Sequence, residues 1–113
     1  MKKYLVFLLL PALALLQFCS SSKKAAVVKS NFDDNVKPLV STKCAPCHTT
    51  GSKSHIAIYD TAKLHVDDII RRISLNPTEK GFMPMKHEKL SDSAINVFVK
   101  WKSDGLLENT ASR

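Results

Sequence analysis

The chain of 113 residues contains little that would build a β-sheet, because no segment alternates apolar and polar residues over more than a few positions. It has no internal repeat. Its one long apolar run, residues 4–18, is shorter than the roughly 20 residues that a membrane-spanning helix needs. Its basic residues do not line up with aromatic residues, which make up only 7% of the chain, and this argues against nucleic acid as a partner. These absences predict an all-α protein without a membrane-spanning helix.

Three helices are expected where apolar residues recur at helical spacing, over residues 33–41, 61–74 and 92–104. Asp60 or Thr61 can cap the second helix, Ser91 caps the third, and Gly105 follows its last turn. Residues 49–59 and 75–90 are expected to be loops. The residues expected to face the core are Phe32, Val36, Leu39, Val40, Ile56, Ile58, Tyr59, Ala62, Val66, Ile69, Ile70, Ile73, Ala94, Ile95, Phe98, Val99 and Trp101. Loops this long in so small a domain suggest that a cofactor or crosslink completes the interior.

A secretory signal is indicated at the N-terminus, where two lysines precede the apolar run. The end of the run, LLQFCSSS, resembles a bacterial lipoprotein signal, in which the cysteine becomes the lipidated first residue and Leu16 stands three positions before Cys19. An ordinary signal-peptidase site at residues 12–14 is the alternative, but it would leave Cys19 as an unpaired thiol in an oxidising compartment. We therefore expect export and a lipid anchor on Cys19, which holds the protein at a membrane without a spanning helix.

These features divide the chain into four parts. Residues 1–18 form the signal, 19–30 the lipidated cysteine and a flexible tether, 31–108 the folded domain, and 109–113 a C-terminal tail. The chain has 17 basic and 10 acidic residues, and removing Lys2 and Lys3 with the signal leaves 15 against 10, a net charge of +5. A basic exported protein suits acidic partners or anionic head groups.

The stretch KCAPCHTTGSK, residues 43–53, carries the strongest chemical signal in the sequence. A redox-active disulfide normally needs a βαβ context, which this chain lacks. Zinc would need four ligands, and only Cys44, Cys47 and two of the four histidines (His48, His55, His65 and His87) could supply them, with no second close pair. A structural disulfide beside a surface histidine is a third alternative. Cys-x-x-Cys-His is, however, the attachment signature for c-type haem.

The spacing of Cys44, Cys47 and His48 has a physical reason. Residues i, i+3 and i+4 lie on one face of a helical turn, so both thiols can reach the vinyl groups of one porphyrin while the imidazole lies under the iron. The imidazole would bind as the neutral ring, with its second nitrogen held by another group.

The order of elements around this motif resembles that of the small class I, mono-haem cytochromes c. In that family an N-terminal helix runs into Cys-x-x-Cys-His, a middle helix follows, and a methionine loop, here GFMPMKHEKL at 81–90, precedes a final helix, here LSDSAINVFVKW. The resemblance covers about residues 31–107. It implies three or four helices with long loops wrapped around one covalent haem c, whose iron is bound by His48 and by Met83, with Met85 as the second candidate.

The resemblance implies a one-electron carrier rather than an enzyme, because two axial ligands leave the iron no open position. Such a carrier would be exported, lie on the periplasmic side of a membrane and serve a respiratory donor and acceptor. Lys80, Lys86 and Lys89 flank the methionines and would steer an acidic redox partner. Two alternatives stay open: a haem subunit of a larger periplasmic oxidoreductase, and a haem enzyme or gas-binding sensor if the methionine ligand is absent or labile.

Overall fold

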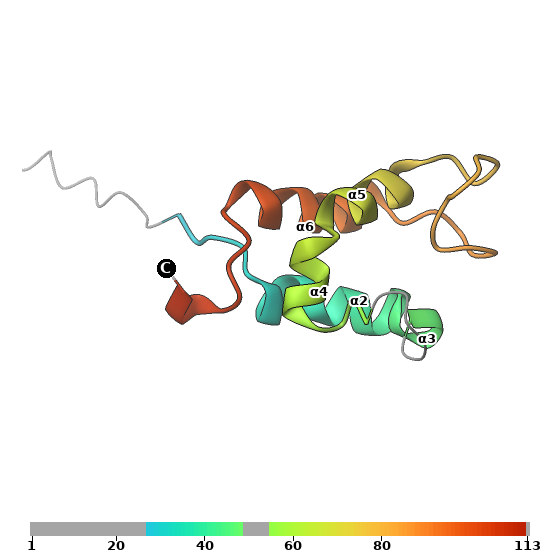
Figure 1. Cartoon of the computed structure of the whole chain (residues 1–113). Helices are drawn as coiled ribbons and strands as arrows, with labels where there is room; N and C mark the ends of the chain where they lie inside the picture. The colour runs from blue at the N-terminus through green and yellow to red at the C-terminus, as the bar shows by residue number, and fades with distance from the viewer. Residues whose placement is uncertain (1–26, 49–54, 113) are drawn as a thin grey trace, which may run out of the picture.

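The computed structural model describes residues 27–48 and 55–112, and within these ranges the chain forms helices and loops without a β-strand. The elements run in the order η2 (Phe32–Val36), α2 (Lys37–Lys43), α3 (Ala45–His48), α4 (Tyr59–Leu64), α5 (Val66–Ser74), α6 (Asp92–Ser103) and η3 (Thr110–Ser112) (Figure 1). An isolated parallel bridge joins Asn31 to Leu107. The predicted all-α class is confirmed.

The first helix is longer than the predicted 33–41, because η2 and α2 run continuously over residues 32–43. Its first turn is a π-turn, in which the Lys37 N–H donates to the Phe32 carbonyl. Pro38 follows at once and has no N–H to donate, so it is tolerated here at the start of the regular α-helix. Asn31 caps the turn, and its side-chain oxygen accepts the Asp34 N–H at 2.8 Å.

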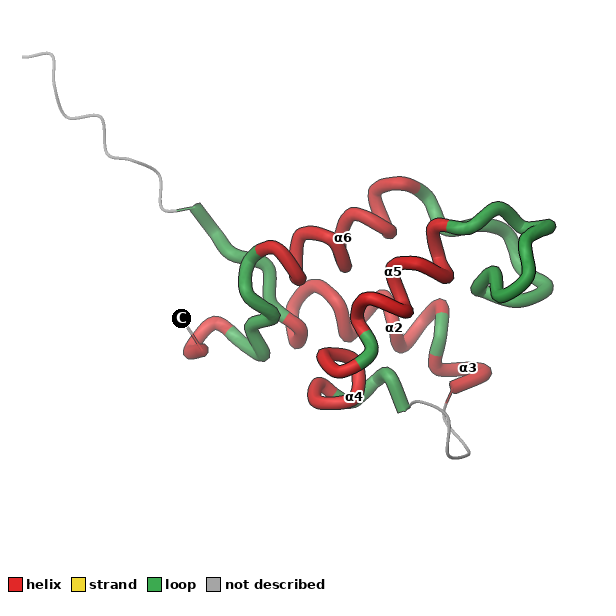
Figure 2. The backbone as a smooth tube through the Cα atoms, turned by 45° about the horizontal axis from the view of Figure 1, so that its top comes forward, coloured by secondary structure: helices red, strands yellow, loops and turns green. Residues whose placement is uncertain are grey.

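The single helix predicted over residues 61–74 is wrong, because the chain forms two helices, α4 and α5, that meet at an angle at His65 (Figure 2). The predicted cap is also wrong, since Ile58 precedes the first turn and makes no side-chain hydrogen bond there. Neither glycine nor proline marks the bend, so it is set by packing rather than by local sequence. The predicted apolar stripe still faces the core despite the bend. Ala62, Val66, Ile69 and Ile73 are buried, and Ile70 is half-buried.

The last helix, α6, begins as predicted, with the Ser91 hydroxyl accepting the Ala94 N–H at 3.3 Å. Val99 was expected to face inward, but 42% of its surface is exposed, because Phe98 and Trp101 already occupy the inward face on either side of it. The helix ends in a Schellman motif, in which Leu106 N–H donates to the Trp101 carbonyl and Gly105 N–H to the Lys102 carbonyl.

Replacing Gly105 by alanine is expected to lower the free energy of unfolding by about 1 kcal/mol. Gly105 has a φ of +103°, and no atom lies within 4 Å of a Cβ built on it, so the cost comes from the backbone conformation alone. Asparagine tolerates this conformation better, and Gly105→Asn should therefore lose less. Chemical denaturation of the three proteins tests this, and equal stabilities would contradict it.

An aromatic cluster joins the start of η2 to the end of α6. Phe32, Tyr59 and Trp101 pack edge to face or tilted, with ring centroids 5.6–6.3 Å apart. The Leu107 carbonyl accepts hydrogen bonds from Phe32 N–H and Trp101 Nε1–H, both at 2.8 Å, and the Leu106 carbonyl accepts one from the Tyr59 hydroxyl at 2.8 Å. The segment after α6 is thereby bound to the start of η2, which brings the first and last helices together.

The packed structure begins at Ser30, one residue before the predicted domain start. Ser30 is buried, and its N–H donates to the Asp104 carboxylate at 2.6 Å. Ile56 is buried as predicted, whereas Ile58 was expected in the core and is 54% exposed. The core consists of Phe32, Val36, Val40, Ile56, Ala62, Val66, Ile69, Ile73, Leu90, Phe98 and Trp101.

The predicted signal, the proposed lipidation site Cys19 and most of the tether lie outside the described residues, as does part of the 49–59 loop. Among the residues that are described, no helix is both long and apolar enough to cross a membrane.

Candidate functional site

The Cys-x-x-Cys-His motif occupies one helical turn at the end of α2. Cys44 continues α2 through a hydrogen bond from its N–H to the Val40 carbonyl at 2.9 Å. The Cys44 carbonyl then accepts the N–H groups of Cys47 and His48, both at 3.1 Å, and these bonds close the turn of α3. The three residues of the motif therefore lie within one hydrogen-bonded turn, as their spacing predicts.

Both cysteines of the motif are free thiols, and they differ in exposure. Cys47 is exposed, whereas Cys44 is half-buried and packs against the core. Burial raises the pKa of the Cys44 thiol above its usual value. His48 is half-buried at the end of the turn. Cys44 and His48 are therefore partly shielded from solvent, whereas Cys47 is exposed to it.

In the reduced chain without haem, iodoacetamide is expected to modify Cys47 before Cys44 at neutral pH. Alkylation requires the thiolate, and Cys44 is both less accessible and harder to ionise. Raising the pH should therefore accelerate modification of Cys44. Peptide mass spectrometry after timed quenching measures both rates, and unfolding the chain in guanidinium should remove the preference. Faster modification of Cys44 in the folded chain would contradict this description.

The second part of the candidate site is the loop between α5 and α6, residues 75–90, which lacks regular secondary structure as predicted. Met83 is half-buried and packs against the core, and the Phe82 side chain beside it is buried. Met85, two residues later, is 62% exposed. A cis peptide bond joins Met83 to Pro84. Of the two candidate sulfur ligands, Met83 is the one that the fold holds against the interior.

The methionine loop is attached to the C-terminal turn of α5. Helix ends leave carbonyls without partners inside the helix, and the loop supplies donors for two of them. Met83 N–H donates to the Arg72 carbonyl at 3.2 Å, and Lys89 Nζ donates to the Ser74 carbonyl at 3.0 Å. One of the three lysines predicted to steer a partner therefore also holds the loop in place.

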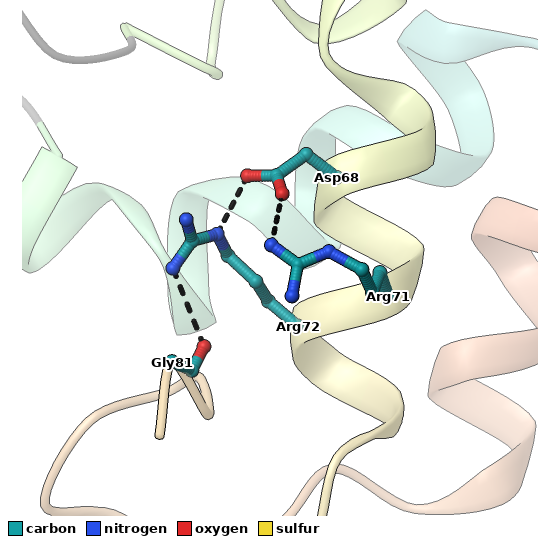
Figure 3. A network of polar contacts seen from close by, with 4 residues as sticks. All are labelled: Asp68, Arg71, Arg72 and Gly81. Carbon is teal, nitrogen blue, oxygen red and sulfur yellow. Dashed lines mark hydrogen bonds and ion pairs between the residues drawn. The ribbon is translucent and has the colours of Figure 1, made fainter. Parts of the chain in front are cut away.

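Arg72 contacts the same loop through its side chain (Figure 3). Its Nη1 donates to the Gly81 carbonyl at 3.4 Å and its Nε to Asp68 at 2.6 Å. Arg71 also pairs with Asp68, although the bonds drawn for it do not reach the loop. The two arginines, Arg72 first, hold the pKa of the Asp68 carboxyl below its usual value. The i, i+4 spacing of Asp68 and Arg72 signals their ion pair in the sequence, whereas the contact with Gly81 depends on the fold.

The motif turn α3 and the methionine loop lie at the same end of the molecule, away from residue 27 and the C-terminus (Figures 1 and 2). Two shallow surface hollows lie elsewhere, where α6 passes η2 and α2, and share Asn35, Ser93 and Val97 in their lining. The candidate site is therefore defined by the motif turn and the loop rather than by these hollows.

The other histidines do not join the motif. His55, His65 and His87 are exposed. Within residues 27–48 and 55–112, which include every candidate zinc ligand named above, no three His, Cys, Asp or Glu side chains come together to hold a metal ion. A haem makes a different demand, because it needs two thiols and an imidazole on one turn and a further ligand from another segment. The donor set of α3 and the methionine loop fits that demand.

Comparison of the chain with protein-family models, with curated proteins and with solved structures finds no match in any of the three.

Proposed function

We propose that this protein is a small cytochrome c that carries single electrons. The observation that carries the proposal is that two free thiols, Cys44 and Cys47, and the imidazole of His48 share one helical turn. This turn lies at the same end of the molecule as a loop that holds Met83 against the core. A first helix that leads into the motif and packs against the last helix also supports the proposal, because the resemblance to the class I cytochromes c implies that order.

The residues that would hold the haem have separate roles. Cys44 and Cys47 would each add across a vinyl double bond, the sulfur bonding one carbon and the thiol proton ending on the other, with no net oxidation. His48, through one ring nitrogen, and Met83, through its thioether sulfur, would be the two protein ligands of the iron. When bound, a haem of this type supplies a reversible Fe(III)/Fe(II) couple. Attachment would require both thiols in the reduced state, and no disulfide joins Cys44 to Cys47.

Ligation by both His48 and Met83 favours electron transfer over catalysis, because these residues would leave the iron no position for substrate. The thioether would favour Fe(II), and burial of the haem would disfavour the more highly charged Fe(III). Both effects raise the reduction potential. The chain's own contribution is thus to hold two ligands in one geometry in both oxidation states.

The expected partners are an electron donor and an electron acceptor of a membrane-associated respiratory chain. Lys80, Lys86 and Lys89 are exposed around the methionine loop, where they would attract an acidic docking surface. Export to the periplasmic side of a membrane and a lipid on Cys19 belong to the same proposal. The electron-transfer rate should then fall as ionic strength rises.

The first test is to co-express the chain with a c-type haem maturation system and to record absorption spectra before and after extraction with acidified acetone. The proposal expects haem that stays with the polypeptide, sharp low-spin reduced bands, and a weak long-wavelength ferric band from methionine sulfur. Retained haem with a high-spin spectrum would favour the enzyme or gas-sensor alternative. Loss of all haem on extraction would contradict the proposal and return Cys44 and Cys47 to the zinc or disulfide alternatives. Stable co-purification with a dehydrogenase would instead favour the subunit alternative.

A further inference from the structure

The methionine loop is joined to α5 by a three-part contact whose centre is Arg72. The Arg72 guanidinium donates to Asp68 on one side and to the Gly81 carbonyl on the other, and its own backbone carbonyl accepts the Met83 N–H. Gly81 precedes Met83 by two residues. A single residue of α5 therefore contacts the loop at Met83 and also at Gly81 just before it. Figure 3 shows the bonds that the Arg72 guanidinium makes.

Several observations show that this contact is specific to Arg72. Arg71 binds the same carboxylate, yet no bond runs from its guanidinium to Gly81 in the network drawn in Figure 3. Gly81 has a φ of +94°, a backbone conformation that residues with a side chain rarely adopt. A Cβ built on Gly81 would lie 3.4 Å from Arg72 Nη1, so the guanidinium and the loop backbone are in close contact.

We propose that Arg72 is a positioning residue for the Met83 ligand, and that the Asp68–Arg72–Gly81 contact limits how often the methionine loop opens. This inference rests on the proposed function, because it holds that Arg72 controls how easily the Met83 thioether dissociates from the haem iron. A bound thioether leaves the iron only when the loop moves, and the loop cannot move far while Gly81 and Met83 stay bonded to Arg72. The arginine suits this role because its planar fork binds a carboxylate and a carbonyl at once.

The test compares Arg72→Gln with Arg71→Gln in the mature haem-loaded protein. Both substitutions remove one positive charge from α5 and one partner from Asp68, but only the first removes the contact with Gly81. Two measurements are made: amide hydrogen exchange at Met83, whose N–H is bonded to the Arg72 carbonyl, and the apparent affinity of the ferric protein for imidazole, which binds only when the methionine has left. Arg72→Gln should increase both by roughly three- to tenfold, the value of one partly exposed charge-assisted hydrogen bond, while Arg71→Gln stays at the parent value.

Arg72→Lys separates the contact from the charge. A lysine keeps the charge but presents one compact ammonium, which does not bridge Asp68 and Gly81 as the guanidinium does. We expect Arg72→Lys to resemble Arg72→Gln. Full recovery of both measurements by lysine would show that only charge matters and would overturn the inference, as would equal effects of the Arg71 and Arg72 substitutions.

The outcomes also separate this inference from the proposed function. A chain that attaches haem but whose Met83 exchange and imidazole affinity do not respond to Arg72→Gln overturns the positioning role alone. Faster exchange without tighter imidazole binding shows that the loop opens without releasing the ligand, and this too overturns the role. A chain that takes no haem overturns the ligand role together with the proposed function, and the exchange measurement then reports only whether Arg72 holds the loop.

Discussion

Replacement of Met83 by alanine is expected to lower the reduction potential by on the order of 0.2 V, a quarter of the roughly 0.8 V over which axial ligands vary the potential of haem proteins. Under the proposed ligation, loss of the thioether would remove the ligand that favours Fe(II) and would admit water or an added ligand to the sixth position. The variant should therefore lose the long-wavelength ferric band and, once reduced, react rapidly with carbon monoxide. Spectroelectrochemical titration and stopped-flow mixing measure the two effects.

Met85→Ala is the matched control for this experiment. It removes the same side chain two residues away, but Met85 is 62% exposed, whereas Met83 is packed against the core. The control should keep the potential and the closed sixth position of the parent. If Met85→Ala loses the ferric band and Met83→Ala keeps it, the choice of Met83 is wrong and the loop must rearrange on haem binding. If both variants keep the band, neither methionine is the ligand.

Trp101→Ala should lower the free energy of unfolding by about 3–5 kcal/mol, a large part of the roughly 5–15 kcal/mol that stabilises a typical domain. The Trp101 side chain is fully buried, lies 5.6 Å from the Phe32 ring between centroids, and donates its Nε1–H to the Leu107 carbonyl. Its removal leaves a large cavity at the point where the first and last helices meet. Chemical denaturation followed by circular dichroism gives the loss.

Two further variants are compared with Trp101→Ala: Trp101→Phe separates the hydrogen bond from the packing, and Val99→Ala is a control at an exposed position. Trp101→Phe keeps an aromatic ring but leaves the Leu107 carbonyl without the indole donor, so it should lose less than the alanine variant. Val99→Ala shortens a side chain of the same helix that is 42% exposed, and it should change stability by only about 0.5 kcal/mol. A Trp101→Ala protein as stable as Val99→Ala would contradict the central place given to this cluster.

The sequence predicts a helix boundary well where the boundary depends on residues within the same turn, as at both ends of α6. Ser91 caps α6 and Gly105 ends it, because capping is a hydrogen bond or a backbone preference within one turn. The bend at His65 is not predicted, since neither glycine nor proline marks it and the two halves turn to bury one apolar stripe. Val99 was placed in the core and is exposed, because helical spacing alone does not show which of two adjacent apolar residues faces inward. Ile58, placed in the core for its apolar side chain in a predicted loop, is exposed as well.

The sequence by itself determined the chemistry of the candidate site. Cys44, Cys47 and His48 lie within five residues, so their placement on one turn follows from helical geometry and needs no distant contact. The tertiary structure added the difference in burial between Met83, which packs against the core, and Met85, which is exposed, and it alone joined Arg72 of α5 to Gly81 of the methionine loop. The physical reason is distance along the chain: hydrogen bonds within one turn are set by local spacing, whereas those between α5 and the loop exist only once the core has packed.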